Sequence, residues 1–490
     1  NGSKWLDGTG EWIAIVDQGF VHGFASSHTN LEFDTKKANG KVVKYGTITA
    51  AGDCFDSSFV LNSKCTNTGY SGGDEITFGH GITVSSIAAA ESGDGGVMGV
   101  AHGAGVHLSG FDQSITSMTA ATLDAYNNYS AVVQNNSWGS VTTGLCQTSA
   151  FWTNWCNSNN VAGGLTIGEA ILLRDAVGWT NSELGQFWSG GSESEWADRI
   201  DAWNTFQNKG VVVFSSGNDQ NDDDVAYYGA LPSLYSQLAE AWISVGWIEV
   251  EGSSLTSGNI TRYGNKCGTA KEYCVVAAGG DYLSFDGGSS YDPVGKFTFS
   301  GQQFTDQNGS SYSAPLVSGI IALLAEAFPN HTPEQLTDRL LASANNTFFT
   351  IEGYTNFVNG VKHGYSDSFG HGIPDAYAAL LPINPGTFST PQSSGLIYFN
   401  PYLHGSPAAI ENGESPNGNY LNSGSSAASL NLTSLIQSSS FGYALQEALS
   451  GKSTYFYDSL NGGFRINMAN LFGSLNSDAS LSSIISSDIS

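Results

Sequence analysis

The chain has 490 residues, 40% of them hydrophobic and 12% aromatic, which is enough apolar material for a large folded core and excludes disorder over its whole length. Its 17 lysine and arginine residues stand against 44 aspartate and glutamate residues, a formal net charge of −27. Nucleic acids and anionic membranes are bound through basic surfaces, so this composition argues against both as partners.

Strand-like and helix-like segments alternate along residues 10–380. Short apolar runs that end in polar or glycine turns are typical of buried strands, and the segments between them are helix-like. The alternation predicts an α/β fold, doubly wound, with a mostly parallel central sheet and helices on both faces. The expected strands are 12–17, 106–111, 131–137, 211–218, 241–248 and 273–280, and the expected helices are 82–91, 118–128, 166–177, 193–208, 313–328 and 333–343.

The composition changes near residue 383, where Gly, Ser, Asn and Pro become dominant. We expect one large domain over 1–382, with an insertion at about 140–195, and a C-terminal extension or linker over 383–490. The longest apolar stretch, 313–328, contains two serines and a glutamate and is shorter than the roughly 18 to 20 residues of a membrane span. It is expected to be a buried helix, and no transmembrane span is expected in this chain.

Six cysteines form three local pairs. No histidine or cysteine stands beside them at the spacing of zinc ligands, so disulfides are favoured over metal sites. Disulfides persist in oxidising compartments, and the chain begins at Asn1 without Met, so we expect a secreted protein from which an upstream signal or propeptide has been removed. The expected pairs are Cys54 with Cys65, Cys146 with Cys156, and Cys267 with Cys274.

Four polar residues stand where strands end or helices begin, and each has a functional and a structural explanation. Asp17 ends a strand, where a buried carboxylate is costly unless it is paired, or it caps a turn. His80, between two glycines at the start of a small-residue helix, is a base or a packing residue. Asn218 follows a strand, where an amide donates to a developing oxyanion or closes a turn. Ser311, just ahead of a helix with Pro315 in its first turn, is a nucleophile at the positive helix end or an N-cap.

The pentapeptide FGHGI occurs twice, at 78–82 and at 369–373. His80 lies between Asp17 and Ser311 in the chain and precedes TVSSIAAA. His371 follows Ser311 and leads into PDAYAALL, which predicts the first turn of a closing helix that packs on the sheet. We therefore expect one functional histidine, His80, and one structural histidine, His371.

The order Asp, His, Asn, Ser on an alternating α/β chain resembles the subtilisin-like serine peptidases, or subtilases. The resemblance covers about residues 10–380. More narrowly, ALPSLYSQLAEAWISVG, NKCGTAKEYCVVAAGG and the segment 441–472 look like the subtilases found as passenger domains of bacterial autotransporters. The motifs that carry the family resemblance are IAIVDQGF, GHGITVSSIAA, NNSWG, VVVFSSGN, GSSYSAPLVSG and FGHGIPDAYAAL.

The resemblance implies a role for each of the four residues. Asp17 would orient the imidazole, His80 would act as general base and then acid, and Ser311 would be the nucleophile. Asn218 and the backbone N–H of Ser311 would form the oxyanion hole. Two strand edges would wall the primary specificity pocket: Ser137, Trp138 and Gly139 on one side, and Ser215, Ser216 and Gly217 on the other.

The sequence departs from the usual subtilase pattern at three places. DQG replaces DTG, Ser310 replaces the Thr before the nucleophile, and YSAPLVSG stands where MASPHVAG is common. None of these changes removes a triad atom or the Asn, so activity is expected. Trp138 leaves the preference of the pocket open.

The insertion is rich in aromatic residues, which either line an extended cleft or pack an inserted subdomain; we favour packing. They are Trp152, Trp155, Trp179, Phe187, Trp188 and Trp196.

The acidic run DQNDDD follows Asn218 at 219–224. Its carboxylates would hold calcium, attract basic substrate residues, or form a solvated loop. No metal ligand is assigned, and structural calcium stays an open alternative.

These observations favour a secreted serine endopeptidase that acts on proteins or peptides as a monomer and needs no cofactor for its chemistry. Display at a bacterial outer surface before release is a further expectation. One alternative is an inactive surface or adhesive passenger with the same fold. Another is an esterase-type hydrolase, which is disfavoured because the serine lies in GSS late in the chain and not in a G-x-S-x-G elbow.

Overall fold

In the computed structural model the chain forms two compact units. One comprises residues 5–355 and 362–376, and the other comprises 1–4, 356–361 and 377–490. The sequence placed the boundary near 383. The residues that the structure describes are 6–17, 43–45, 74–90, 98–110, 115–139, 154, 165–252, 255–280, 283–285, 289–291, 297–299, 302–304, 308–383 and 453–467.

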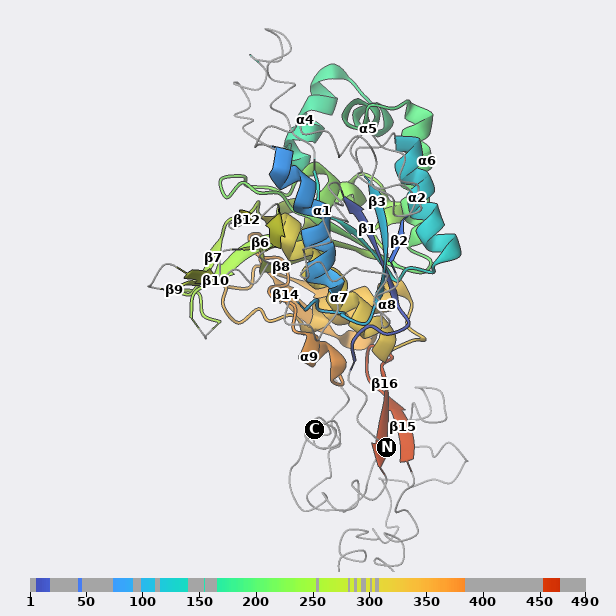
Figure 1. The fold of residues 1–490 in the computed structure, drawn as a ribbon, viewed down its shortest axis with the longest axis vertical. Helices are drawn as coiled ribbons and strands as arrows, with labels where there is room; N and C mark the ends of the chain where they lie inside the picture. The colour runs from blue at the N-terminus through green and yellow to red at the C-terminus, as the bar shows by residue number, and fades with distance from the viewer. Residues whose placement is uncertain are drawn as a thin grey trace, which may run out of the picture. The chain divides into compact units, whose positions relative to one another are not determined.

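An eight-stranded sheet forms the centre of the larger unit (Figure 1). Its order is β2-β3-β1-β4-β5-β6-β7, and β8 also pairs with β6. Every pairing is parallel except that between β6 and β7, which confirms the predicted mostly parallel sheet. The strands are β1 (Trp12–Asp17), β2 (Val43–Tyr45), β3 (Gly105–Gly110), β4 (Val133–Asn136), β5 (Val211–Ser215), β6 (Trp242–Val250), β7 (Ile260–Arg262) and β8 (Cys274–Ala278).

The register of the central strands brings their carboxyl ends to one level. Val16 of β1 pairs with Asn136 of β4, and Asn136 pairs with Phe214 of β5. The next residue of each strand, Asp17, Ser137 or Ser215, therefore stands at the same edge of the sheet. This is the edge at which open α/β sheets bind ligands.

Two groups of helices pack against this sheet, on different sides of the strands in Figure 1. In one group α7 packs against α1, α8 and strands β4, β5, β6 and β8. In the other, α2 packs on α6, and α6 packs on α5 and β5. The helices are α1 (Asp74–Ala89), α2 (Ile115–Asn128), α4 (Ile167–Val177), α5 (Asn181–Ser189), α6 (Glu193–Phe206), α7 (Ser310–Ala327) and α8 (Pro333–Ser343).

Two predicted helix starts were too late. Helix α1 begins at Asp74, so His80 lies inside the helix and not at its start. Helix α7 begins at Ser310 after the N-cap Gly309, so Ser311 lies in its first turn and not ahead of it. Glycine next to the histidine suggested a turn, but a helix tolerates an isolated glycine at a cost of about 1 kcal/mol.

Helix α7 is long and apolar enough for a membrane crossing by length and composition, but 67% of that stretch is buried inside the protein. That burial is typical of a core helix, as the sequence predicted.

The smaller elements include several that the sequence did not predict, among them the hairpin β15 (Ser453–Tyr457) and β16 (Gly463–Asn467). Asp458 holds its turn by accepting hydrogen bonds from the N–H groups of Leu460 and Gly462. Other short elements are β9 (Leu283–Phe285), β10 (Ser289–Tyr291), β11 (Phe297–Phe299), β12 (Gln302–Phe304), β13 (Gly353–Asn356), β14 (Lys362–Tyr365), α9 (Ala376–Leu380), and the 3-10 helices η2 (Tyr227–Ser233), η3 (Ser236–Leu238), η4 (Gly268–Tyr273) and η5 (Val358–Gly360).

Candidate active site

Asp17 and His80 form a direct hydrogen bond. Asp17 ends β1 with its side chain 0% exposed, and its Oδ1 lies 2.6 Å from Nδ1 of His80, whose side chain is 21% exposed. A carboxylate accepts, so the ring donates through Nδ1 and keeps Nε2 as its second nitrogen. Burial lowers the pKa of His80, but the charge of Asp17 and its hydrogen bond together raise it, and the net pKa lies above the ordinary 6.5.

Ser311 lies close to this pair through its neighbour in α7. The ring of Tyr312 contacts the ring of His80, with centroids 5.4 Å apart. Ser311 is half-buried, and its hydroxyl donates to the backbone oxygen of Ser137 at 3.0 Å. In return, the Ser137 hydroxyl donates to the backbone oxygen of Ser311 at 2.7 Å. The end of β4 and the first turn of α7 are thus joined twice.

Helix α1, which carries His80, packs closely on α7, which carries Ser311. A Cβ added at Gly319 of α7 would lie 2.5 Å from Cβ of Val100 and 3.0 Å from the backbone oxygen of Ala88 in α1, so glycine suits this close approach. Ala88 lies about two helical turns after His80, and Gly319 the same distance after Ser311. Small residues along both helices therefore bring His80 and the Ser311 region together.

Asn218 is held by Ser310, the residue before Ser311. Its Oδ1 accepts from both the N–H of Ser310, at 2.8 Å, and the hydroxyl of Ser310, at 2.7 Å. Two donors on Oδ1 direct the amide nitrogen away from Ser310. Gly309 has φ +149°, and a Cβ there would lie 3.0 Å from Nδ2 of Asn218, so both its conformation and its lack of a side chain suit this position.

The two segments expected to wall a specificity pocket follow neighbouring strands β4 and β5. Ser137, Ser215 and Ser216 are buried, while Gly139 is exposed. Trp138 is half-buried and packs edge-on against Phe214 and Tyr228, with centroids 5.2 and 4.9 Å away.

Gly217, in the second of these segments, has φ +111°, and a Cβ there would lie 2.3 Å from Oδ1 of Asn265. The backbone can pass here only because this residue is glycine.

The acidic loop after Asn218 uses most of its carboxylates within the protein. Asp224 accepts from the N–H and hydroxyl of Thr269, and Asp223 pairs with Lys266 at 2.6 Å. Burial and, after it, the charge of Asp219 raise the pKa of Asp222 to about 7. Within the described ranges, no three His, Cys, Asp or Glu side chains gather as metal ligands would.

The aromatic residues of the insertion divide between core and surface. Trp196 is 1% exposed, and its indole N–H donates to the hydroxyl of Tyr235 at 2.8 Å. Trp179 and Trp188 pack partly buried against the same core, while Phe187 is 37% exposed. These four residues pack an added helical layer made by α4, α5 and α6. Trp152, Trp155, Cys146 and Cys156 lie outside the described residues, as do Cys54 and Cys65.

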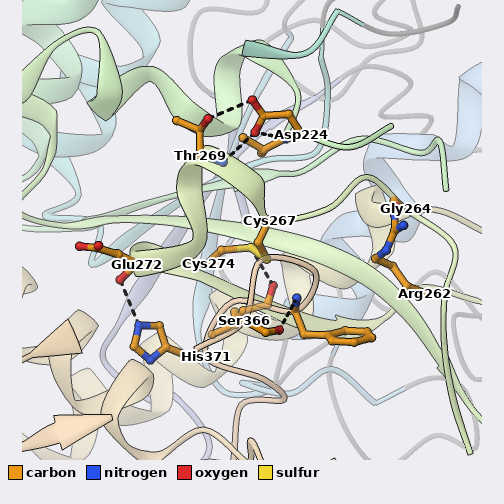
Figure 2. Close-up of a disulfide and its surroundings, with 12 residues drawn as sticks. Asp224, Arg262, Gly264, Cys267, Thr269, Glu272, Cys274, Ser366 and His371 are labelled. Atoms are coloured by element: carbon orange, nitrogen blue, oxygen red, sulfur yellow. Dashed lines mark hydrogen bonds between the residues drawn. A yellow bond between two sulfur atoms is a disulfide. The ribbon is translucent and has the colours of Figure 1, made fainter. Parts of the chain in front are cut away.

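The second FGHGI histidine, His371, lies fully buried beside a disulfide between Cys267 and Cys274 (Figure 2). Its backbone N–H donates to the backbone oxygen of Cys274 at 2.8 Å, and its ring Nε2 lies 3.1 Å from the backbone oxygen of Glu272. Its Nδ1 faces Nδ1 of His363 at 2.9 Å, a separation with room for one proton. Burial and His363 together lower the pKa of His371 to about 3.

This histidine should make the protein less stable in acid. The unfolded chain protonates His371 below its ordinary pKa of 6.5, whereas the folded chain keeps it neutral down to about 3. The free energy of unfolding should therefore fall with decreasing pH across this window, by about 1.4 kcal/mol per pH unit for one proton. Urea unfolding between pH 7 and 4 measures the slope, which should be shallower in His371→Gln. Equal slopes in the two proteins would contradict the assignment.

The sequence predicted Ser137 only as part of a pocket wall and assigned Ser310 no role. The Ser137 hydroxyl holds the first turn of α7, and the Ser310 hydroxyl holds Asn218. Their positions in the chain are the one sequence feature that points to them, because each serine lies next to a residue already named as a candidate. Their hydrogen-bond partners could not be predicted, since these lie far away in the chain.

The chain is similar to several known proteins over parts of their length. It is 29% identical over 134 residues to Serotype-specific antigen 1 of Mannheimia haemolytica, covering 27% of this chain and 13% of that protein. It is 24% identical over 298 residues to the Extracellular serine protease of Serratia marcescens, covering 56% of this chain and 26% of that protein.

Fervidolysin of Fervidobacterium pennivorans is 26% identical over 181 residues, which cover 36% of this chain and 22% of that protein. Its crystal structure, described as that of a keratinolytic enzyme related to subtilisin, matches with 20% identity and a TM-score of 0.41 over 77% of this chain and 44% of that one. The chain therefore spans about a quarter or less of the length of these curated relatives.

A family model settles the broader relationship. It is the model of the subtilase family, and it matches residues 8–372. That range covers most of the 490 residues and includes every residue of the candidate site. The chain belongs to the subtilase family.

Proposed function

We propose that this protein is a serine endopeptidase that cleaves peptide bonds through an acyl-enzyme. The observation that carries the proposal is the 2.6 Å hydrogen bond between Asp17 and His80 at the carboxyl edge of the sheet, with Tyr312, the neighbour of Ser311, against the same imidazole. Membership of the subtilase family supports it. Protein or peptide substrates follow from the same chemistry.

In the proposed mechanism, His80 removes the proton of the Ser311 hydroxyl through Nε2, while Asp17 holds Nδ1–H and stabilises the imidazolium that forms. The hydroxyl must first leave the backbone oxygen of Ser137, to which it donates in this structure. Ser311 Oγ then attacks the substrate carbonyl, and His80 returns the proton to the leaving amine. A water molecule, which His80 deprotonates in the same way, then attacks the acyl-enzyme, and the carboxylic acid product and free Ser311 are released.

The developing oxyanion would be bound by Nδ2 of Asn218 and the backbone N–H of Ser311. The support is that Ser310 occupies Oδ1 of Asn218 twice, which leaves the amide nitrogen as the end that donates. The Ser311 N–H belongs to the first turn of α7, where N–H groups have no partner within the helix. Ser137, Trp138, Gly139, Ser215 and Gly217 are proposed to contact the substrate side chain before the cleaved bond.

Secretion is proposed from the Cys267–Cys274 disulfide together with the relatives, one of which is named an extracellular protease. Structural calcium also remains a proposal; thermal melting with calcium or with a chelator tests it.

The proposal is tested by reacting the purified protein with a fluorophosphonate probe. Ser311 should be labelled, as located by peptide mapping, and casein hydrolysis should be lost in proportion to labelling. A folded protein that neither reacts with the probe nor hydrolyses casein would instead support the alternative of an inactive, adhesive subtilase-fold protein.

Labelling should depend on pH through His80. Because the base must be neutral, and because its pKa lies above 6.5, the labelling rate should fall about tenfold per pH unit once the pH drops below that raised pKa. The measurement is the second-order rate constant of labelling from pH 9 to 5. A rate that stays flat down to pH 5 would contradict a role for His80 as base.

A further inference from the structure

A buried row of hydrogen bonds runs from the interior of α7 to the candidate nucleophile. Ser318 Oγ lies 3.0 Å from Oδ1 of Asn135 and 3.1 Å from the backbone oxygen of Ala314, so its one proton is shared. Nδ2 of Asn135 donates to the hydroxyl of Ser137 at 2.8 Å, and that hydroxyl donates to the backbone oxygen of Ser311 at 2.7 Å. Asn135 and Ser318 are 0% exposed and Ser137 is 2% exposed, so water does not compete.

The end of this row meets a backbone group that the helix itself cannot satisfy. In an α-helix the oxygen of residue 311 would accept from the N–H of residue 315. That residue is Pro315, which has no N–H. The Ser137 hydroxyl supplies the missing donor, so the position of the Ser311 backbone depends on the side chain of the residue that directly follows β4.

Asn135 decides where the proton of Ser137 points. A serine hydroxyl has one proton and two lone pairs. Because Nδ2 of Asn135 donates to one lone pair, the proton of Ser137 is left for the oxygen of Ser311. Without Asn135, the hydroxyl would be free to rotate away, and the backbone oxygen of Ser311 would lose this hydrogen bond.

We propose that Asn135 is a positioning residue for the nucleophile, acting through Ser137 on the backbone of Ser311. The inference rests on the proposed role of Ser311. Nucleophilic attack needs near-contact geometry, so a small displacement of this turn costs rate and not substrate affinity.

The test is Asn135→Ala, with active sites counted by fluorophosphonate. The labelling rate constant and kcat on succinylated casein should each fall roughly 10- to 100-fold, while KM stays within about twofold. Ser137→Ala should show a similar loss. Because Asn135 acts through Ser137, the double variant should be no slower than Ser137→Ala alone, whereas two independent structural effects would add.

The matched control is Asn136→Ala on the same strand. Asn136 is equally buried, but its Nδ2 donates to the backbone oxygens of Val213 and Gln134 and not toward Ser311. This variant should lose stability and keep its labelling rate per folded molecule. Should Asn135→Ala fold poorly, the near-isosteric Asn135→Asp replaces Nδ2 by an acid oxygen that draws the Ser137 proton away from Ser311, and slower labelling is again expected.

The outcomes separate this inference from the function on which it rests. If the native protein is labelled at Ser311 but Asn135→Ala reacts as fast as Asn136→Ala, the positioning role is wrong and the peptidase proposal stands. Additive losses in the double variant would likewise overturn the route through Ser137. A native protein that is not labelled overturns both.

Discussion

Ser311→Ala is expected to abolish casein hydrolysis and fluorophosphonate labelling while the protein stays folded. The substitution removes the single oxygen that would form the acyl-enzyme, and neither Ser310 nor Ser137 can replace it. The Ser310 hydroxyl donates its hydrogen bond to Asn218, and the Ser137 hydroxyl donates its hydrogen bond to the backbone oxygen of Ser311. In subtilisin itself, a member of this family, loss of the corresponding serine lowers kcat on the order of a million-fold.

The matched control is Ser310→Ala, one residue earlier in the same turn. It removes a hydroxyl that holds Asn218 but leaves the N–H of Ser310 on the same amide oxygen. Hydrolysis should therefore be reduced and labelling at Ser311 should persist. Casein hydrolysis by Ser311→Ala at the native rate, in protein free of contaminating peptidase, would refute the assignment of the nucleophile.

His80→Ala and His371→Ala should have opposite effects, although both histidines occur in the same pentapeptide. Loss of His80 would remove the proposed base, which is hydrogen-bonded to Asp17, and in subtilisin itself loss of the catalytic histidine costs on the order of a million-fold in kcat. Loss of His371 removes a buried ring that contacts His363 and Glu272, which should destabilise the fold by about 2 to 4 kcal/mol. Its kcat per folded molecule should not change.

The two variants are compared by kcat per folded molecule and by urea unfolding midpoint. His80 is the hydrogen-bond partner of the buried Asp17 carboxylate, so His80→Ala should also lose stability, and kcat per folded molecule is the measurement that separates the two variants. If His371→Ala loses turnover as severely as His80→Ala while remaining folded, the separation into one base and one structural histidine is mistaken.

The strands were predictable because their signals are local. WIAIVD, VVVF and CVVAA are short continuous apolar runs, as expected of strands buried on both faces, and each became a strand of the parallel sheet. The hairpin β15–β16 was missed because STYFY and GFRIN lie in serine- and glycine-rich surroundings that resemble a linker. Helix starts were misplaced because glycine beside His80 indicates a turn as readily as a helix.

The candidate site was partly predictable for the same reason. Asp17, Asn218 and Ser311 could be singled out because each follows a strand or opens a helix, and the parallel sheet brings such ends to one edge. The side-chain partners were not predictable. Ser137 and Ser311 are 174 residues apart in the chain, and nothing in NNSWG or GSSYSAP indicates which serine hydroxyl donates to which carbonyl.

The sequence by itself determined the fold class, the kinds of chemical group at the sheet edge and the order in which they occur, because hydrophobic period and turn residues act over a few neighbours. Only the tertiary structure decided that Asp17 is hydrogen-bonded to His80 and that Ser310 orients the amide of Asn218. It also decided that the Ser137 hydroxyl, which accepts from Asn135, donates to the Ser311 oxygen that Pro315 leaves without an N–H partner. These contacts depend on strand register and on how closely α1 and α7 pack, both of which are set by residues far apart in the chain.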